Sequence, residues 1–276
     1  MGGVIQPQGS SKRLIQPRGS SKRTSPYRAV FKPPRPSNII VAIKQPTATT
    51  NMTSMSATSI ALEQRWKMLS DFVQTVCAGR DESHGHTHMK TVAEMSSFLI
   101  QQDYTDRRQY RNLLQDAITA AWLHDIADHK YDHDGTLEKR LDEFGTANIS
   151  NYADIKNVIK YVSYSTENKA LLAGTPLDFD KLLTPYYALV RHIVSDADKL
   201  QAIGKIGITR ALTYTRDANP TFTEAQVIAE VRKHADEKLL RLATEFIRTH
   251  TARALARKEH EEMEEWLAQR TTAVEQ

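Results

Sequence analysis

The sequence predicts an all-α protein, and three observations support this class. From Ser59 onward, apolar residues recur at three- and four-residue spacings, which is the period of an amphipathic helix. Thr223 with Gln226 forms a capping box, a helix-start signal. The one strand-like run, 38–43, lies in a segment rich in Pro, Gly and Ser. At 276 residues the chain fits one domain with extra segments, so we expect a tail over 1–57 and a helical domain over 58–271.

The helices of this domain are separated by recognisable stop signals. Gly79 ends the first apolar-periodic stretch, and Gly145 ends a short stretch of acidic and basic residues. Gly174 and Pro176 predict a loop over 165–180. In chain order, the expected helices cover residues 59–79, 88–99, 107–129, 135–144, 151–163, 182–214 and 223–271.

The tail differs sharply from the domain in charge. Residues 1–60 contain nine Lys or Arg and no acidic residue. Within them, the ten residues 14–23 are a near repeat of residues 4–13. The composition of the tail predicts a disordered segment, either a solvated extension or a mitochondrial or plastid transit peptide. Met52 and Met55 are alternative starts. We therefore expect an intracellular protein, cytoplasmic unless the tail is a transit peptide.

The composition of the domain excludes several classes of protein. No apolar run approaches the ~18 residues of a membrane span. Cys77 is the single cysteine, so the chain has no internal disulfide framework, which fits a reducing compartment. We expect the Cys77 side chain to pack in the core. Residues 61–276 carry 28 basic and 33 acidic residues, so the pI near 9.0 belongs to the tail. We do not expect the domain to bind nucleic acid or a membrane.

The strongest functional signal is the pair His124-Asp125, inside the run Ala-Ala-Trp-Leu-His-Asp-Ile-Ala-Asp at 120–128. Adjacent helical residues lie about 100° apart, so both side chains can reach one ion. His88 lies 36 residues upstream, and Asp196-Ala-Asp198 follows about 70 residues downstream. Imidazole and carboxylate ligands suit Mn, Fe, Co, Ni or Mg, and such an ion can activate water for attack on a phosphoester or phosphoanhydride.

The order His88, His124-Asp125, Asp198 resembles the signature of the HD-domain metal-dependent phosphohydrolases, in particular their small stand-alone bacterial members. The resemblance covers about residues 60–245. Its motifs are Ser-His-Gly at 83–85 with His-Met-Lys-Thr-Val at 88–92, Leu-His-Asp-Ile-Ala-Asp-His-Lys-Tyr at 123–131, and the stretch from Asp-Ala-Asp-Lys-Leu to Arg at 196–210.

The resemblance implies a metal site formed by four residues: His88, His124, Asp125 and Asp198. Asp198 is chosen because a basic residue and Leu follow it, and Asp196 is the fallback. His84 precedes His88 by one turn if its helix begins early, so it could line the site or replace His88.

Four further residues are candidates for catalysis or substrate binding. Asp128, three residues after Asp125, would share its helical face and could orient or deprotonate the attacking water. Asp128-His129 stands where HD enzymes that hydrolyse guanosine tetraphosphate carry Glu-Asp, which argues against that substrate. Lys169, Lys199 and Arg210 are candidate phosphate-binding residues, with surface solvation as the alternative for each.

The function expected from the resemblance is hydrolysis of a nucleotide with one divalent ion, preferably Mn²⁺, with Mg²⁺, Co²⁺, Ni²⁺ or Fe²⁺ as alternatives. Cleavage of a nucleoside triphosphate to the monophosphate and pyrophosphate is preferred, with a 5′-nucleotidase as the alternative. A non-catalytic nucleotide sensor and a two-iron oxygenase stay open, the latter needing His84 or His129 as extra ligands. The sequence leaves the base, the sugar and the oligomeric state undecided, and a homodimer stays open.

Overall fold

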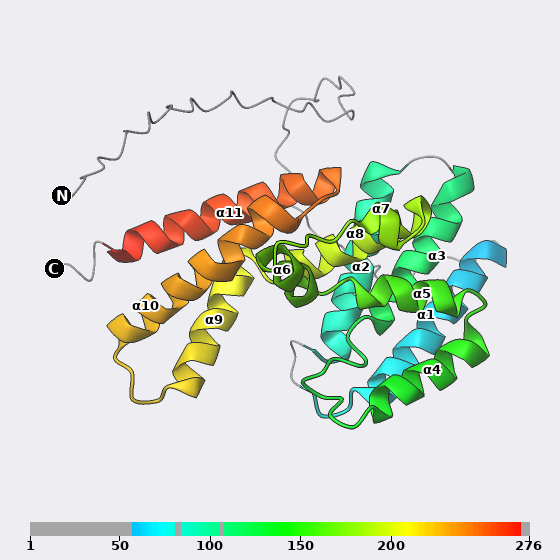
Figure 1. Cartoon of the computed structure of the whole chain (residues 1–276), viewed down its shortest axis with the longest axis horizontal. Coiled ribbons are helices and arrows are strands. Elements are labelled where there is room, and N and C mark those ends of the chain that lie inside the picture. The colour runs from blue at the N-terminus through cyan, green and yellow to red at the C-terminus, as the bar shows by residue number, and fades with distance from the viewer. Residues whose placement is uncertain (1–56, 81–83, 105–106, 272–276) are drawn as a thin grey trace, which may run out of the picture. The chain divides into compact units, whose positions relative to one another are not determined.

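The computed structural model of the chain describes residues 57–80, 84–104 and 107–271. The predictions for the tail concern residues outside these ranges, apart from residue 57, which begins the first helix. Figure 1 shows the helices in chain order. Their bounds are α1 Ala57–Val76, α2 His86–Asp103, α3 Arg107–Leu123, α4 Thr136–Asn148, α5 Tyr152–Lys160, α6 Tyr164–Leu172, α7 Phe179–Leu182, α8 Pro185–Leu200, α9 Gly204–Ala218, α10 Glu224–His234 and α11 His250–Thr271.

The described residues form helices joined by turns and irregular segments, without a strand, so the predicted all-α class is confirmed. Two short π-helices, η1 (Ala235–Leu239) and η2 (Leu242–Phe246), join α10 to α11. None of the helices in the described ranges has the length and hydropathy of a membrane span. The capping box at Thr223 is present and begins α10 as predicted.

Helices α2, α3 and α8 pack against one another and form the centre of the domain. Their inward faces carry fully buried apolar side chains, and burial of each Val, Leu or Met side chain contributes about 1.5–3 kcal/mol. These side chains include Met89 and Val92 of α2, Ala117 and Leu123 of α3, and Val194 and Ala197 of α8. Helices α1 and α5 pack on α3, and α11 packs on α2, α8 and α9. The ends of α2, α3 and α8 are thereby held close together.

The structure corrects several predicted boundaries. The 165–180 segment is a loop only over 173–178, because it also contains most of α6 and the first half of α7. Ser163 begins α6 by accepting a hydrogen bond from the Ser165 N–H at 3.2 Å. The long helix expected to end near 214 is broken after Leu200 into α8 and α9, and Gly204 adopts a φ of +68° at the start of α9.

The most consequential correction is that α3 ends at Leu123 rather than at 129. Beyond Leu123 the backbone forms turns with hydrogen bonds between residues three positions apart. The Ile126 N–H donates to the Leu123 carbonyl, and the Asp128 N–H donates to the Asp125 carbonyl. The segment 124–127 is therefore a turn between α3 and α4, and α4 begins where the Asp132 carboxylate accepts the N–H groups of Leu137 and Glu138.

Candidate metal centre

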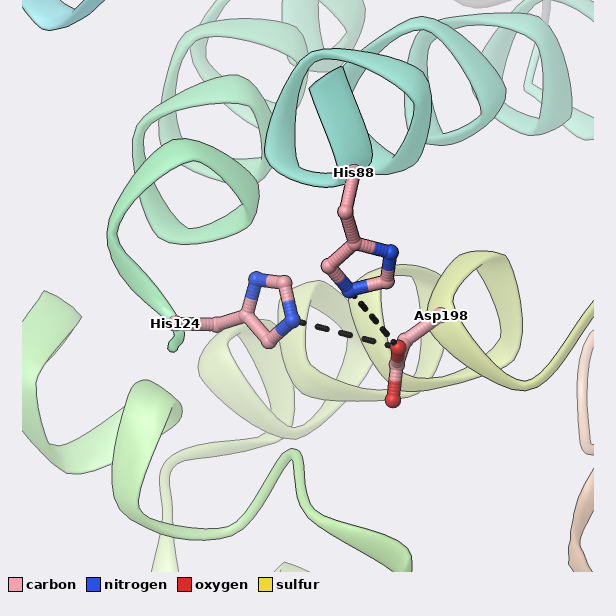
Figure 2. A group of neighbouring side chains, drawn as sticks. All are labelled: His88, His124 and Asp198. Carbon is pink, nitrogen blue, oxygen red and sulfur yellow. Dashed lines mark ion pairs between the residues drawn. The ribbon is translucent and has the colours of Figure 1, made fainter. Parts of the chain in front are cut away.

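Three segments that are distant in the sequence bring imidazole and carboxylate groups to one point (Figure 2). His88 lies in the first turn of α2, and Asp198 lies in the last turn of α8. His124 and Asp125 lie in the turn that follows α3. The helix ends are fixed by the packing of α2, α3 and α8, so the core of the fold positions these side chains.

The facing atoms of these residues lie within a few ångströms of one another. His88 Nε2 lies 3.3 Å from Asp198 Oδ1 and 3.7 Å from Asp125 Oδ2. His124 Nε2 lies 3.6 Å from Asp125 Oδ1 and 3.9 Å from Asp198 Oδ1. The ligand atoms of His88, His124 and Asp198 all lie within 4.8 Å of one another. Two imidazole nitrogens and two carboxylates thus face one small volume.

The ring of His124 is oriented as a metal ligand requires. Its Nδ1–H donates a hydrogen bond of 2.8 Å to the backbone carbonyl of Ala121, which fixes the tautomer and leaves the lone pair on Nε2. This Nε2 is buried and has no hydrogen-bond partner. A buried, unpartnered acceptor beside two carboxylates is costly unless a cation lies between them. The residues therefore fit a divalent ion.

The imidazoles keep Asp198 ionised. Burial acts to raise the pKa of Asp198, but the hydrogen bond from His88 and the neighbouring His124 outweigh it and hold the pKa well below its usual range. For His124, burial acts to lower the pKa, and Asp125 and Asp198 outweigh it and raise the pKa. These shifts keep the carboxylate of Asp198 negative and favour a positive charge beside it.

Arg80 holds the turn that carries His124 and Asp125, a role that no pattern in the sequence indicates. Its guanidinium donates hydrogen bonds to the backbone carbonyls of Asp125 at 2.7 Å and Ile126 at 2.6 Å. The same guanidinium stacks over the ring of Tyr131, 4.5 Å from its centroid. No spacing rule connects residue 80 to a turn 45 residues later, so this role required the structure.

The two acidic residues of the third motif face opposite sides of α8. Residues two positions apart on a helix lie about 200° apart, so only one of them can reach the cluster. Asp198 is that residue. Asp196 is fully buried and accepts the backbone N–H groups of Arg248, at 2.9 Å, and Thr249, at 2.6 Å, which fixes the start of α11. Asp196, the fallback ligand, therefore has another role.

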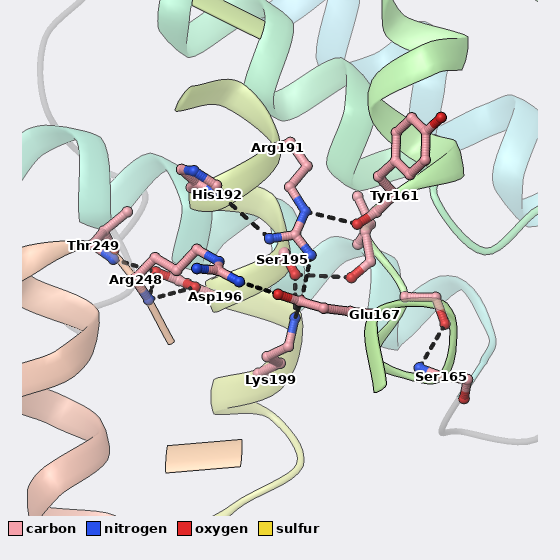
Figure 3. Close-up of polar contacts among 12 residues, drawn as sticks. Tyr161, Ser165, Glu167, Arg191, His192, Ser195, Asp196, Lys199, Arg248 and Thr249 are labelled. Atoms are coloured by element: carbon pink, nitrogen blue, oxygen red, sulfur yellow. Dashed lines mark hydrogen bonds and ion pairs between the residues drawn. The ribbon is translucent and has the colours of Figure 1, made fainter. Parts of the chain in front are cut away.

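Lys199 does not lie on a substrate-accessible surface, which corrects the phosphate-binding prediction. Its side chain is buried and donates to Ser195 Oγ, and its Nζ lies 3.6 Å from Glu167 Oε2 (Figure 3). Glu167 also accepts from the guanidinium groups of Arg191, at 2.6 Å, and Arg248. Burial, with the neighbouring Arg191, lowers the pKa of Lys199 to about 8. Three cations thus surround one buried carboxylate and join α6, α8 and the start of α11.

The structure moves Asp128 off the helical face that the sequence predicted, because α3 ends at Leu123. The Asp128 carboxylate lies in the turn after the cluster and accepts the N–H of Lys130 at 2.8 Å. His84 precedes α2, which begins at His86, so the early helix start that would align it with His88 does not occur. The His84 ring lies 5.6 Å from that of Tyr131.

The remaining two phosphate-binding candidates lie on the surface. Lys169 is exposed on α6 rather than in a loop. Arg210 is exposed on α9 and donates to the carbonyl of Gln201 at 3.1 Å, which places it near the end of α8 that carries Asp198.

Comparisons with known proteins agree with this architecture, although no family model matches the chain. YpgQ of Bacillus subtilis is 26% identical over 209 residues, which is 74% of this chain and 90% of YpgQ. The crystal structure of YpgQ in complex with ADP matches at a TM-score of 0.54 and 23% identity, and covers 77% of this chain and 96% of YpgQ. The chain has the fold of YpgQ. A crystal structure of a Lactobacillus plantarum protein matches at a TM-score of 0.57 and 25% identity, covering 76% and 97% of the two chains.

The chain shares the fold of YpgQ and of the Lactobacillus plantarum protein, and the three motifs singled out in the sequence converge in it, while membership of the HD family stays a prediction from the sequence. The YpgQ match bears on the fold, because its structure is less than a quarter identical to this chain. The roles of His88, His124, Asp125 and Asp198 as metal ligands stay predictions, supported by the geometry of their side chains.

Proposed function

We propose that the protein is a divalent-metal-dependent phosphohydrolase that acts on a nucleotide. The observation that carries this proposal is the convergence of two imidazole nitrogens and two carboxylates, with the buried Nε2 of His124 facing them without a partner. Mn²⁺ is the preferred ion, since this mixed nitrogen and oxygen set suits a first-row divalent cation. The ion would be held by His88, His124, Asp125 and Asp198.

A bound ion would supply Lewis-acid polarisation of a phosphate oxygen and would lower the pKa of water beside it. The chain's own residues would supply the charge, the positioning and the proton acceptor. Asp125 and Asp198 supply negative charge, and Ala121 and Arg80 fix the positions of His124 and Asp125. Asp128, in the same turn, is the proposed acceptor of the proton that the attacking water loses.

The preferred reaction is cleavage of a nucleoside triphosphate between its α and β phosphorus atoms. The oxygen of water bonds to the α phosphorus, and the electron pair of the broken P–O bond leaves with pyrophosphate. Two observations support a nucleotide as substrate: the resemblance of the 123–131 motif to HD nucleotide pyrophosphohydrolases, and the ADP bound in the YpgQ structure.

The test is a screen of nucleoside triphosphates, deoxynucleoside triphosphates and monophosphates with Mn²⁺, in which pyrophosphate and orthophosphate are measured separately. Pyrophosphate from a triphosphate supports the proposal. Orthophosphate from a monophosphate would replace it with a 5′-nucleotidase, and binding without turnover would replace it with a nucleotide sensor. The Asp125→Ala variant should lose turnover, and Asp217→Asn, a change of an exposed acid on α9, should retain it.

A further inference from the structure

The last turn of α8, which carries Asp198, is held by apolar packing and by one buried charge. Ala197 and Leu200 lie in the apolar core. Between them in the sequence, the side chain of Lys199 is 1% exposed, and its Nζ donates a hydrogen bond to Ser195 Oγ, one turn earlier. Burial of an ammonium group costs free energy that an apolar side chain at the same position would not cost. Stability alone therefore does not explain a lysine at this position.

The carboxylate that faces Lys199 belongs to Glu167, the only buried residue of α6, a helix that the structure describes throughout. Glu167 Oε2 lies 3.6 Å from Lys199 Nζ and 2.6 Å from Arg191 Nη2, and Oε1 accepts from the guanidinium of Arg248 (Figure 3). The first residue of α6 makes a ring contact with η2, and the rest of the helix is exposed or partly exposed. One carboxylate thus attaches most of α6 to the domain.

Ser195 extends this contact to the segment before α6. Its Oγ accepts from Lys199 and donates to the backbone carbonyl of Val162 at 2.8 Å, in the connection between α5 and α6. Glu167, Lys199, Ser195 and Val162 are all buried. A buried polar network of this kind favours a single arrangement, because a shift of one member leaves another without its partner. The last turn of α8 is therefore fixed relative to α6.

The orientation of Lys199 bears directly on the candidate metal centre. Adjacent helical residues lie about 100° apart, so Lys199 faces α6 while the preceding residue faces the cluster. Asp198 Oδ1 lies 3.3 Å from His88 Nε2 and 3.9 Å from His124 Nε2. Metal ligands must be held within about 0.5 Å of their binding geometry by the residues that support them. A fixed Lys199 sets the rotation of the turn about the axis of α8, and with it the position of the Asp198 carboxylate.

We propose that Lys199 is a positioning residue of the metal centre and that, through Glu167, it couples the docking of α6 to metal binding. When this contact is lost, the apolar packing of the turn stays, but Asp198 gains freedom that metal binding must remove. Coupling between two sites is reciprocal, so a bound ion must stabilise the docked α6 by the same factor. This role rests on the proposed function, because it requires that the cluster bind a divalent ion.

The first test is the Mn²⁺ affinity of the full-length protein, measured by calorimetric titration. Lys199→Met keeps the length of the side chain and removes its charge, so Mn²⁺ should bind about tenfold more weakly, as for other residues that orient metal ligands. Ser195→Ala should weaken binding by about threefold, the effect of one lost hydrogen bond. Glu167→Gln should weaken binding in wild type but not in Lys199→Met, because both changes act through one contact. Lys233→Met, a change of an exposed lysine on α10, is the matched control.

The second test is the hydrogen exchange of the backbone amides of α6, with and without Mn²⁺. In wild type, Mn²⁺ should slow this exchange by about tenfold, which is the factor that reciprocity requires. In Lys199→Met, the ion should leave the exchange of α6 unchanged. Helix α4, which lies outside this network, reports any general stabilisation by the ion. A lysine that only stabilises the fold would not make the exchange of α6 depend on Mn²⁺.

The outcomes separate this role from the proposed function. Suppose that wild type binds Mn²⁺ and hydrolyses a nucleotide. Equal Mn²⁺ affinity in Lys199→Met, or exchange of α6 that responds to Mn²⁺ equally in wild type and Lys199→Met, would then overturn the positioning role alone. Ser195→Ala decides the same question if Lys199→Met does not fold. A wild type that neither binds Mn²⁺ nor hydrolyses a nucleotide contradicts the proposed function itself.

Discussion

The guanidinium of Arg80 is hydrogen-bonded to the backbone carbonyl of Asp125, at 2.7 Å, and not to its carboxylate. The carboxylate of Asp125 is thereby left to face His88 and His124. A second hydrogen bond, to Ile126, holds the following peptide. The Arg80 side chain thus fixes the turn that follows α3, and this turn carries two residues of the candidate site, His124 and Asp125.

Replacing Arg80 by Met should weaken metal binding while the four proposed ligands stay present. The change removes two charged hydrogen bonds and leaves two carbonyls unpaired, which should lower the free energy of unfolding by about 2 kcal/mol. The affinity for Mn²⁺ should fall by about 10- to 100-fold, as for other residues that orient metal ligands. Calorimetric titration and chemical unfolding check both values. Arg140→Met, on the exposed side of α4, should change neither, and an unchanged Mn²⁺ affinity in Arg80→Met would refute the role.

Asp198→Asn and Asp196→Asn should have opposite consequences. Asp198→Asn removes a proposed ligand, so Mn²⁺ binding should be lost while stability changes little. Asp196→Asn weakens the buried hydrogen bonds to Arg248 and Thr249, so the free energy of unfolding should fall by about 1.5–3 kcal/mol. Measuring Mn²⁺ affinity and unfolding for both variants separates the roles. Retained binding in Asp198→Asn with loss in Asp196→Asn would reverse the assignment.

Glu167→Gln should destabilise the protein at neutral pH by about 3–5 kcal/mol, because it leaves Arg191, Lys199 and Arg248 without their shared counter-charge. Burial acts to raise the pKa of Glu167, but the charges of Arg191 and Lys199 outweigh it and lower the pKa from 4.5.

A depressed carboxyl pKa contributes stability that is fully present above the unfolded pKa and is lost as the pH falls through the folded pKa. The difference in stability between wild type and Glu167→Gln should therefore be constant above pH 4.5 and shrink below it. Urea unfolding from pH 7 down to pH 3 measures this difference. A difference that is the same at both ends of the range would show that the charge of Glu167 is not what stabilises the network.

The sequence was sufficient for the fold class and for the residues that converge at the site. His88, His124, Asp125 and Asp198 lie in motifs with fixed order, and apolar periodicity located most helices. It was insufficient for the end of α3, because a helical composition continues past Leu123. Arg80 donates hydrogen bonds to the turn that follows this helix, and no local sequence signal marks that contact.

Long-range burial explains the other differences. Lys199 and Arg210 are both basic residues near the third motif, yet one is buried in an ion network and the other is exposed. Which side of α8 faces Glu167 depends on how α6 packs, and α6 itself lay in a stretch predicted as a loop.

The central claim is that His88, His124, Asp125 and Asp198 bind one divalent ion that hydrolysis requires. The most direct measurement is the metal content and Mn²⁺ titration of the full-length protein, compared with His124→Gln and read beside nucleotide turnover. We expect one ion per chain in wild type, no binding in the variant, and turnover that is lost in parallel and by chelation. Two irons per chain, or full turnover in His124→Gln, would contradict the account.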